Sequence, residues 1–218
     1  MARHTGEKEA GRHKSMICCV LLASGFGRRF GSNKLLYELN GTPLYLHALD
    51  MLRQLSKRRI DGQEIRVVVV SQYEEIETQA CKLGAQAVHN PDAVEGIAAS
   101  VRYGVQAAAD AEWMAFFTAD QPYLRAETVF RFLEAAIHSG TSMASVISAG
   151  KPGNPTLFHR SRQQELLQLA GDVGGRSIMK RHPEQVFWFE IPEEERWDMD
   201  VLPGANQPDA VDKPTDFR

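Results

Sequence analysis

Glycines and basic residues are concentrated in one stretch, LLASGFGRRFGSNKLL, at residues 21–36. Glycine lets a backbone approach an anion closely and point N–H groups at it, and Arg28, Arg29 and Lys34 add positive charge. The glycine spacing matches neither the dinucleotide-binding motif nor a Walker A loop. The stretch therefore predicts a phosphate-binding loop, and the alternative is a flexible loop with solvated charges.

Two acidic positions suit a metal ion. Asp120 directly follows the apolar run FFTA, where a carboxylate suits Mg²⁺, which binds a few hard oxygens together with substrate phosphates. The alternative roles of Asp120 are to initiate a turn or to cap a helix. In WDMD, Asp198 and Asp200 point to one side of an extended segment, which also suits a metal. The alternative is that both are surface acids.

Two further stretches, GKPGNP at 150–155 and GDVGGR at 171–176, predict loops. In the second, Asp172 is expected to cap a helix, and the following glycines with Arg176 to hold a second anion. Either stretch alone is more often structural than functional. The histidines show no metal-ligand spacing, and no G-x-S-x-G nucleophile motif is present.

Composition sets bounds on function. The net charge of −3 shows no basic excess, so nucleic acid is not indicated as the main partner. The longest apolar runs are too short to span a membrane. Residues 1–15 lack the apolar region of a signal peptide, and three cysteines make a poor disulfide framework, so the cytoplasm is the expected compartment. Cys18 and Cys19 are expected to be buried as small hydrophobic residues.

Four apolar strands alternate with four helical segments in the first 140 residues. The alternation predicts an α/β fold with three layers, a mostly parallel twisted sheet with helices on both faces. Ligands of such sheets bind beyond the carboxyl ends of the strands, so the glycine loop and the Asp120 turn are expected to meet. The strands are expected at Met16–Ala23, Glu64–Ser71, Ala87–His89 and Trp113–Thr118, and the helices at Leu44–Leu55, Glu74–Leu83, Ile97–Ala109 and Ala126–His138.

The pattern changes after residue 141, without a linker. We expect a single domain at 16–202, with a first part at about 16–125 and a second part at about 126–202. Residues 1–15 are expected to be a disordered extension, with Met16 as the real start, and 203–218 a loosely held tail. The later elements are expected as strands at Ser142–Ser148 and Gln185–Ile191 and helices at Arg162–Leu169 and Gly175–Arg181.

Taken together, the motifs resemble one family. LLASGFGRRFGSNKLL resembles the L-A-x-G-x-x-x-R-M-G-x-x-K signature of MobA-like nucleotidyltransferases, with Phe30 in place of the usual Met. NPDAVEGIAASVRYGV resembles the segment near the base, and ADQP, GNP, GDVGGR and WDMD follow in the family's order. The set is most similar to the molybdenum cofactor cytidylyltransferases, the MocA-like branch, over Met16 to Asp200. The resemblance implies a Rossmann-like fold of the nucleotide-diphospho-sugar transferase type. It also implies that the domain at 16–202 is a nucleotidyltransferase domain, with an NTP-binding part at about 16–125 and an acceptor-binding part at about 126–202.

The resemblance also assigns roles to individual residues. Arg29 and Lys34 would bind the phosphates, and Asp120 would bind Mg²⁺; these three are the expected catalytic residues. The second metal ligand stays open among Asp198, Asp200 and Asp212, because the usual T-P-E-D ending is displaced. Nucleotide contacts would come from Leu22, Ala23, Ser24, Gly25 and Gly27, the base side would be lined by Asn90, Gly96 and Ser100, and the acceptor would face Gly153, Asn154, Gly175 and Arg176.

The implied reaction transfers CMP from CTP to the molybdopterin form of the molybdenum cofactor and releases pyrophosphate, with Mg²⁺ as cofactor. Ser24 and Asn33 favour CTP, because the guanylyl branch usually carries L-A-G-G and G-G-x-D-K. A guanylyltransferase and a sugar-phosphate nucleotidyltransferase of the same fold remain alternatives. A further alternative is a non-catalytic carrier of the molybdenum cofactor. The expected protein partner is a molybdenum hydroxylase or its maturation factor.

Overall fold

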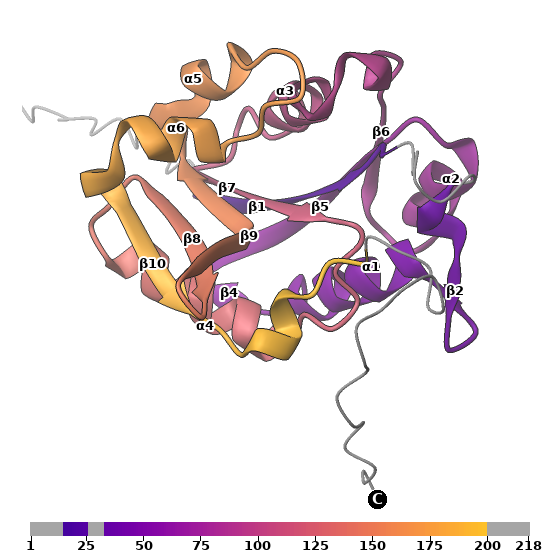
Figure 1. Cartoon of the computed structure of the whole chain (residues 1–218), viewed down its shortest axis with the longest axis horizontal. Helices are drawn as coiled ribbons and strands as arrows, with labels where there is room; N and C mark the ends of the chain where they lie inside the picture. The colour runs from indigo at the N-terminus through magenta and orange to yellow at the C-terminus, as the bar shows by residue number, and fades with distance from the viewer. Residues whose placement is uncertain (1–14, 26–32, 200–218) are drawn as a thin grey trace, which may run out of the picture.

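A twisted eight-stranded sheet crosses the centre of the molecule (Figure 1). The computed structural model describes residues 15–25 and 33–199. The strand order is β10-β8-β9-β7-β1-β5-β4, and β6 also pairs with β5. The strands are β1 (Met16–Ala23), β4 (Arg59–Ile60), β5 (Gln63–Ser71), β6 (Gln86–His89), β7 (Trp113–Thr118), β8 (Met143–Ser148), β9 (Lys151–His159) and β10 (Val186–Glu190), and β2 (Glu38–Leu39) pairs with β3 (Thr42–Pro43) in a separate hairpin.

Most strands of the sheet run in one direction. β1 is parallel to both β5 and β7, and β10 is parallel to β8. β9 is antiparallel to both of its neighbours, so β8 runs the same way as β7. The short β4 is also antiparallel. This arrangement confirms the predicted three-layer α/β fold with a mostly parallel sheet.

One predicted loop is a strand. The GKPGNP stretch was expected to be a loop, but only Ala149 and Gly150 make the turn, and β9 begins at Lys151. Pro152 pairs with Ile147, and the register shifts between that residue and Ser145. Such an irregularity tolerates prolines, which cannot donate to the ladder. The prediction failed because glycine and proline are turn signals in the sequence.

The helices cover both faces of the sheet. α3, α5 and α6 lie on one side of it and α1 and α4 on the other (Figure 1). The predicted helices and the other predicted strands agree with the structure to within two residues. The α-helices are α1 (Leu44–Leu55), α2 (Glu74–Lys82), α3 (Ile97–Ala107), α4 (Ala126–His138), α5 (Gln163–Leu167) and α6 (Arg176–Arg181), and the 3₁₀ turns are η1 (Lys34–Leu36), η2 (Ala93–Glu95), η3 (Arg160–Arg162), η4 (Pro183–Gln185) and η5 (Glu193–Arg196).

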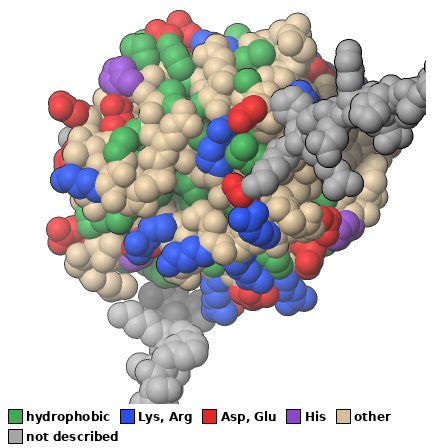
Figure 2. Space-filling view, turned by 180° about the vertical axis from the view of Figure 1, so that it is seen from behind, with side chains coloured by type: hydrophobic (Ala, Val, Ile, Leu, Met, Phe, Trp, Pro, Cys, Tyr) green, Lys and Arg blue, Asp and Glu red, His purple; other side chains and the backbone are tan. Residues whose placement is uncertain are grey.

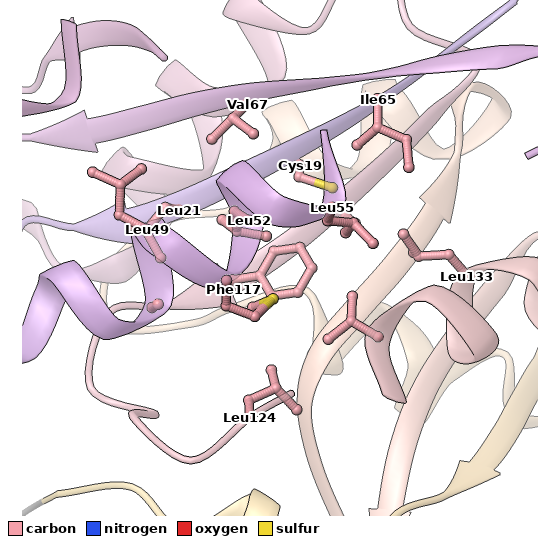
Figure 3. Packing of buried hydrophobic residues seen from close by; sticks show 14 of the residues in the cluster. Cys19, Leu21, Leu49, Leu52, Leu55, Ile65, Val67, Phe117, Leu124 and Leu133 are labelled. Atoms are coloured by element: carbon pink, nitrogen blue, oxygen red, sulfur yellow. The ribbon is translucent and has the colours of Figure 1, made fainter. Parts of the chain in front are cut away.

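The side chains of β1 alternate between two hydrophobic clusters, as the pleat requires. Cys19 and Leu21 join the cluster under α1 and α4 (Figure 3), whereas Cys18 and Val20 join the cluster under α3. The two neighbouring cysteines therefore lie on opposite faces, fully buried. Burial raises the pKa of the Cys18 thiol to about 11, so the thiol stays protonated and uncharged at neutral pH. Cys18 is therefore buried as a small hydrophobic residue, as expected.

The outer surface carries charges of both signs. Figure 2 shows basic and acidic side chains interspersed over one face, with hydrophobic ones scattered between them. Several form surface ion pairs, such as Arg58 with Glu127 at 2.7 Å and Arg66 with Asp110 at 2.6 Å. Among the described residues, we find no helix with the length and apolar character needed to cross a bilayer.

The first turn of α4 is capped by a residue from a distant part of the chain. The Glu195 carboxylate is 1% exposed, and it accepts hydrogen bonds from the Arg125 amide at 3.1 Å and the Thr128 hydroxyl at 2.9 Å. A carboxylate at this position also interacts favourably with the helix dipole. Glu195 thus fastens the C-terminal part of the described chain to the start of α4.

We predict that Glu195→Ala lowers the free energy of unfolding by about 1–3 kcal/mol, because two partly buried donors lose their acceptor. Urea denaturation followed by circular dichroism measures the effect. Glu194→Ala is the matched control, since Glu194 is exposed and belongs to the same turn. Equal unfolding midpoints for the two variants would contradict the capping role.

Candidate active site

A cavity of about 510 Å³ opens at the carboxyl ends of β1 and β7. Its walls come from five separate parts of the chain: the end of β1, the end of β7, η1, the continuous segment of η2 and the first turn of α3, and the loop before α6. This is the edge of the sheet where parallel α/β folds bind ligands. The position agrees with the expectation from the sequence.

A short ion pair joins Lys34, which is predicted to bind phosphate, to Asp120, which is predicted to bind a metal ion. Lys34 Nζ lies 2.6 Å from Asp120 Oδ2, and the side chains are 15% and 17% exposed. The predicted meeting of the glycine loop and the Asp120 turn is therefore confirmed for Lys34. Asp120 caps no helix, because α4 begins at Ala126 and is capped by Glu195.

Two buried oxygens beside this ion pair lack a hydrogen-bond partner in the described structure. They are Asp120 Oδ1 and Thr118 Oγ1, and both residues line the cavity. Buried polar atoms are nearly always satisfied, so an unpaired carboxylate oxygen on a residue that lines the cavity calls for a partner such as a ligand. Carboxylate and hydroxyl oxygens fit Mg²⁺, which commonly takes one or two protein carboxylates and completes its shell with water and substrate phosphates.

A chain of buried hydrogen bonds forms the wall between β1 and α3. The Asn90 amide donates to Ser100 Oγ at 2.9 Å and to Ser24 Oγ at 3.2 Å, and Ser24 donates in turn to the Val70 carbonyl. Ser24 and Ser100 line the cavity, whereas Asn90 is completely buried behind them. Asn90 therefore positions the two serines and does not itself line the cavity.

The segment that follows β1 is held from the side by β5. Ser71 Oγ donates to the Ala23 carbonyl at 3.0 Å, and the Gln72 amide donates to the Ser24 carbonyl at 2.6 Å. The Tyr73 hydroxyl donates to the Gly25 carbonyl at 3.1 Å. These bonds satisfy three successive backbone carbonyls at the start of the glycine loop. The backbone at this point is therefore oriented by residues that lie outside the loop.

Gly96 allows two loops to meet at the cavity. Its φ of 101° and ψ of −174° belong to a region that is essentially restricted to glycine. A Cβ atom there would lie 2.7 Å from the backbone of Gly171. The Ala98 amide donates to the Gly171 carbonyl at 3.2 Å, which fixes the 171–172 loop against the start of α3. Asp172 consequently lines the cavity and does not cap α6, contrary to the expectation from the sequence.

The predicted acceptor residues lie beside the cavity, not in its walls. Gly153 and Asn154 are in β9, and Gly175 packs so closely on Phe158 that a Cβ atom would lie 2.6 Å from the ring. Arg176 begins α6. Desolvation lowers the pKa of Arg176, and Asp198 raises it, so this carboxylate lies within electrostatic range of the guanidinium.

A model of the MobA-like NTP transferase domain matches residues 19–186. The chain belongs to the MobA-like NTP transferase family. Curated relatives include probable molybdenum cofactor guanylyltransferases of Pyrococcus horikoshii, 42% identical over 55 residues, and Thermococcus sibiricus, 39% identical over 59 residues. The matches cover 25–27% of this chain and 26–27% of these relatives.

Solved structures share the fold over most of the chain. A nucleotidyl transferase from Methanothermobacter superposes with a TM-score of 0.69 at 20% identity, covering 85% of this chain and 92% of that one. Rv0371c from Mycobacterium tuberculosis gives 0.66 at 21% identity over 82% and 89%, respectively. A CMP-2-keto-3-deoxy-manno-octonic acid synthetase complexed with CTP gives 0.62 at 15% identity over 81% and 90%. At such identities the likeness concerns the fold alone.

Not every residue that the MobA-like resemblance assigned to the site lies in the cavity. Those that line it include Leu22, Ser24, Gly25 and Lys34. The Ala23 side chain instead points to the hydrophobic cluster on the opposite face of the sheet, because side chains alternate along β1. Four assigned positions, Gly27, Arg29, Asp200 and Asp212, lie outside the described residues.

Sequence reasoning missed several residues of this MobA-like site. Thr118 carries no motif, but it is the last residue of β7 and faces the same side as Ser24, a signal that strand alternation provides. Gln72, Tyr73 and Glu195 act through contacts 48 or more residues away in sequence, for which a single sequence offers no signal.

We predict that Gly96→Ala lowers both stability and nucleotide affinity, because the new Cβ atom would displace the Gly171 backbone. The backbone strain alone costs about 1–3 kcal/mol. Gly62→Ala is the control, since Gly62 has a φ of 77° but open space around its Cα atom. Urea denaturation and calorimetric titration with nucleotide measure the two effects. Nucleotide affinity reduced equally by both substitutions would contradict a local role for Gly96.

Proposed function

We propose that this protein transfers CMP from CTP to the terminal phosphate of the molybdopterin form of the molybdenum cofactor, with Mg²⁺ as the metal. The observation that carries the proposal is the meeting of Lys34 with Asp120, whose second oxygen is unpaired, in the cavity at the carboxyl edge of the sheet. Membership of the MobA-like family supports nucleotidyl transfer.

The proposed reaction is a displacement at phosphorus. An oxygen of the acceptor phosphate attacks the α-phosphorus of CTP, a new P–O bond forms, and the bond to the bridging oxygen breaks so that pyrophosphate leaves. The attacking phosphate is already ionised near pH 7, so no side chain has to remove a proton. Catalysis then depends on positioning and charge stabilisation.

Lys34 exchanges partners in this proposal. In the structure its ammonium group is neutralised by Asp120. A triphosphate offers several anionic oxygens, so Lys34 is expected to turn toward the phosphates and leave both Asp120 oxygens for the metal. The metal supplies charge neutralisation at the phosphates when it is bound. Arg29, which the resemblance also assigns to the phosphates, would add a second positive charge.

The choice of CTP is supported by Ser24. This position is glycine in the guanylyl pattern, whereas here a hydroxymethyl group forms part of the cavity wall and is fixed by Asn90 and Val70. The smaller space favours a pyrimidine over a purine. GTP is the second candidate, because both curated relatives are described as guanylyltransferases.

The remaining assignments follow from the proposed reaction. Four assignments stay predictions. They are the acceptor-binding part at 126–202, the second metal ligand among Asp198, Asp200 and Asp212, transfer to a molybdenum hydroxylase or its maturation factor, and the cytoplasmic location. The single-domain organisation is supported by one sheet that takes strands from both predicted parts.

Incubation with each NTP, Mg²⁺ and the molybdopterin cofactor tests the proposal directly. We expect pyrophosphate release with CTP and a cytosine dinucleotide product identified by mass spectrometry. A guanine dinucleotide would replace the proposal by the second candidate. Cofactor binding without pyrophosphate release for any NTP would favour the non-catalytic carrier.

We predict that Asp120→Asn reduces CMP transfer at least about a hundredfold, by analogy with the loss of other preorganised electrostatic groups. The asparagine keeps the shape but removes the charge that binds the metal and Lys34. Mn²⁺ binding in the presence of CTP, followed by electron paramagnetic resonance, should weaken in parallel. Asp110→Asn removes a surface carboxylate paired with Arg66 and should leave both measurements unchanged. Near-normal transfer by Asp120→Asn would exclude Asp120 from the metal site.

We predict that Lys34→Ala weakens binding of CTP more than binding of CMP, because Lys34 contacts the outer phosphates. Charge-assisted hydrogen bonds contribute about 1.5–3 kcal/mol, so CTP affinity should fall about tenfold or more. Lys57→Ala, at an exposed position after α1, is the control. Calorimetric titration with both nucleotides gives the comparison. An equal loss for CTP and CMP would show that Lys34 does not bind the outer phosphates.

A further inference from the structure

The C-terminal segment, residues 193–199, is fastened beside the Asp120 turn at three points. Glu195 caps α4, the Gln121 amide donates to the Arg196 carbonyl at 3.4 Å, and the Met199 amide donates to the Asp120 carbonyl at 3.0 Å. Arg196 therefore lies on a segment whose place relative to the site is determined by hydrogen bonds on either side. Neither the resemblance nor the family match assigns a role to Arg196.

The stem of Arg196 lies on β9 at a glycine. A Cβ atom at Gly153 would lie 3.2 Å from Arg196 Cγ and 3.4 Å from Cδ, so the absence of a side chain there makes room for the arginine. Arg196 Nε is buried and has no hydrogen-bond partner in the described structure. A buried guanidinium N–H without an acceptor costs free energy, and a bound anion would remove that cost.

A second guanidinium lies in the same region. Desolvation lowers the pKa of Arg176 most, Asp198 raises it and Arg196 lowers it, so Asp198 and Arg196 both lie within electrostatic range of Arg176. The region therefore holds two guanidinium groups and the Asp198 carboxylate. Arg176 is exposed, so its side chain can contact a ligand. Neither arginine lines the nucleotide cavity.

We propose that Arg196, together with Arg176, binds the terminal phosphate of the acceptor and holds it beside Asp120 for attack on the nucleotide. The planar guanidinium fork suits the oxygens of a phosphate monoester, and an excess of positive charge favours a dianion. The inference rests on the proposed function, because it identifies the group of the acceptor that these arginines recognise. It also gives Gly153 a function, since the glycine makes room for the Arg196 stem.

Fluorescent pterins derived from the cofactor test the inference without requiring catalysis. The probes are the oxidised pterin phosphate and the same pterin after removal of its phosphate by a phosphatase. Fluorescence anisotropy compares wild type, Arg196→Ala and Arg196→Lys, each saturated with a non-hydrolysable CTP analogue and Mg²⁺. Arg160→Ala is the matched control, because Arg160 is exposed and follows β9 at the opposite edge of the sheet.

We expect Arg196→Ala to weaken binding of the pterin phosphate about tenfold or more and to leave binding of the dephosphorylated pterin unchanged. Arg196→Lys should recover part of the affinity because it keeps the charge. Urea midpoints and CTP affinity within about twofold of wild type would show that the fold and the nucleotide cavity are intact. An unchanged affinity for the pterin phosphate, or an equal loss for both pterins or for CTP, would overturn the inference.

Failure of the proposed acceptor is distinguishable from failure of the anion site. If the wild-type protein binds neither pterin, the molybdopterin acceptor is wrong, and inorganic phosphate becomes the probe. Calorimetric titration with phosphate at constant ionic strength, with the CTP analogue bound, then compares the same four proteins. Weaker binding by Arg196→Ala alone would retain the anion site for another phosphorylated acceptor, whereas equal binding by all four would exclude it.

Discussion

The parallel pairing of β1 with β7 is the constraint on which the site depends. Because the two strands are neighbours that run in the same direction, the segments that follow them leave the sheet at the same edge. Lys34 and Asp120 are 86 residues apart in the sequence, yet their charged groups lie 2.6 Å apart. Reversing either strand would send one of these groups to the opposite edge, and no local change in the loops would compensate.

The second half of the chain reaches the same edge by a different route. β9 runs antiparallel to its neighbours, so its first residues, including Gly153, lie near the carboxyl ends of β7 and β8. The segment after β10 then returns along this edge and is fastened by Glu195 and Met199. One antiparallel strand and one buried carboxylate thereby bring the proposed acceptor residues alongside the nucleotide cavity.

Charge is distributed unevenly between the two sides. In the nucleotide cavity the Lys34 ammonium group is neutralised by Asp120, which limits the cost of burying either charge. Beside it, Arg196 and Asp198 both lie within electrostatic range of Arg176, and the Arg196 Nε has no hydrogen-bond partner among the described residues. We infer that the first side is organised to exchange an internal ion pair for metal and phosphates, and the second to receive an anion.

The sequence by itself determined the fold class and most helix and strand boundaries, and it singled out Lys34, Asp120 and Ser100, which line the cavity, because apolar periodicity and short motifs are local properties of the chain. It led to the wrong structure for GKPGNP, since proline and glycine in a strand are compatible only with the register that the neighbouring strands impose. It also left open which oxygen of Asp120 is paired, and it missed Glu195 and Arg196. Only the tertiary structure decided these points, because hydrogen bonds and close packing between distant segments depend on where the sheet places them.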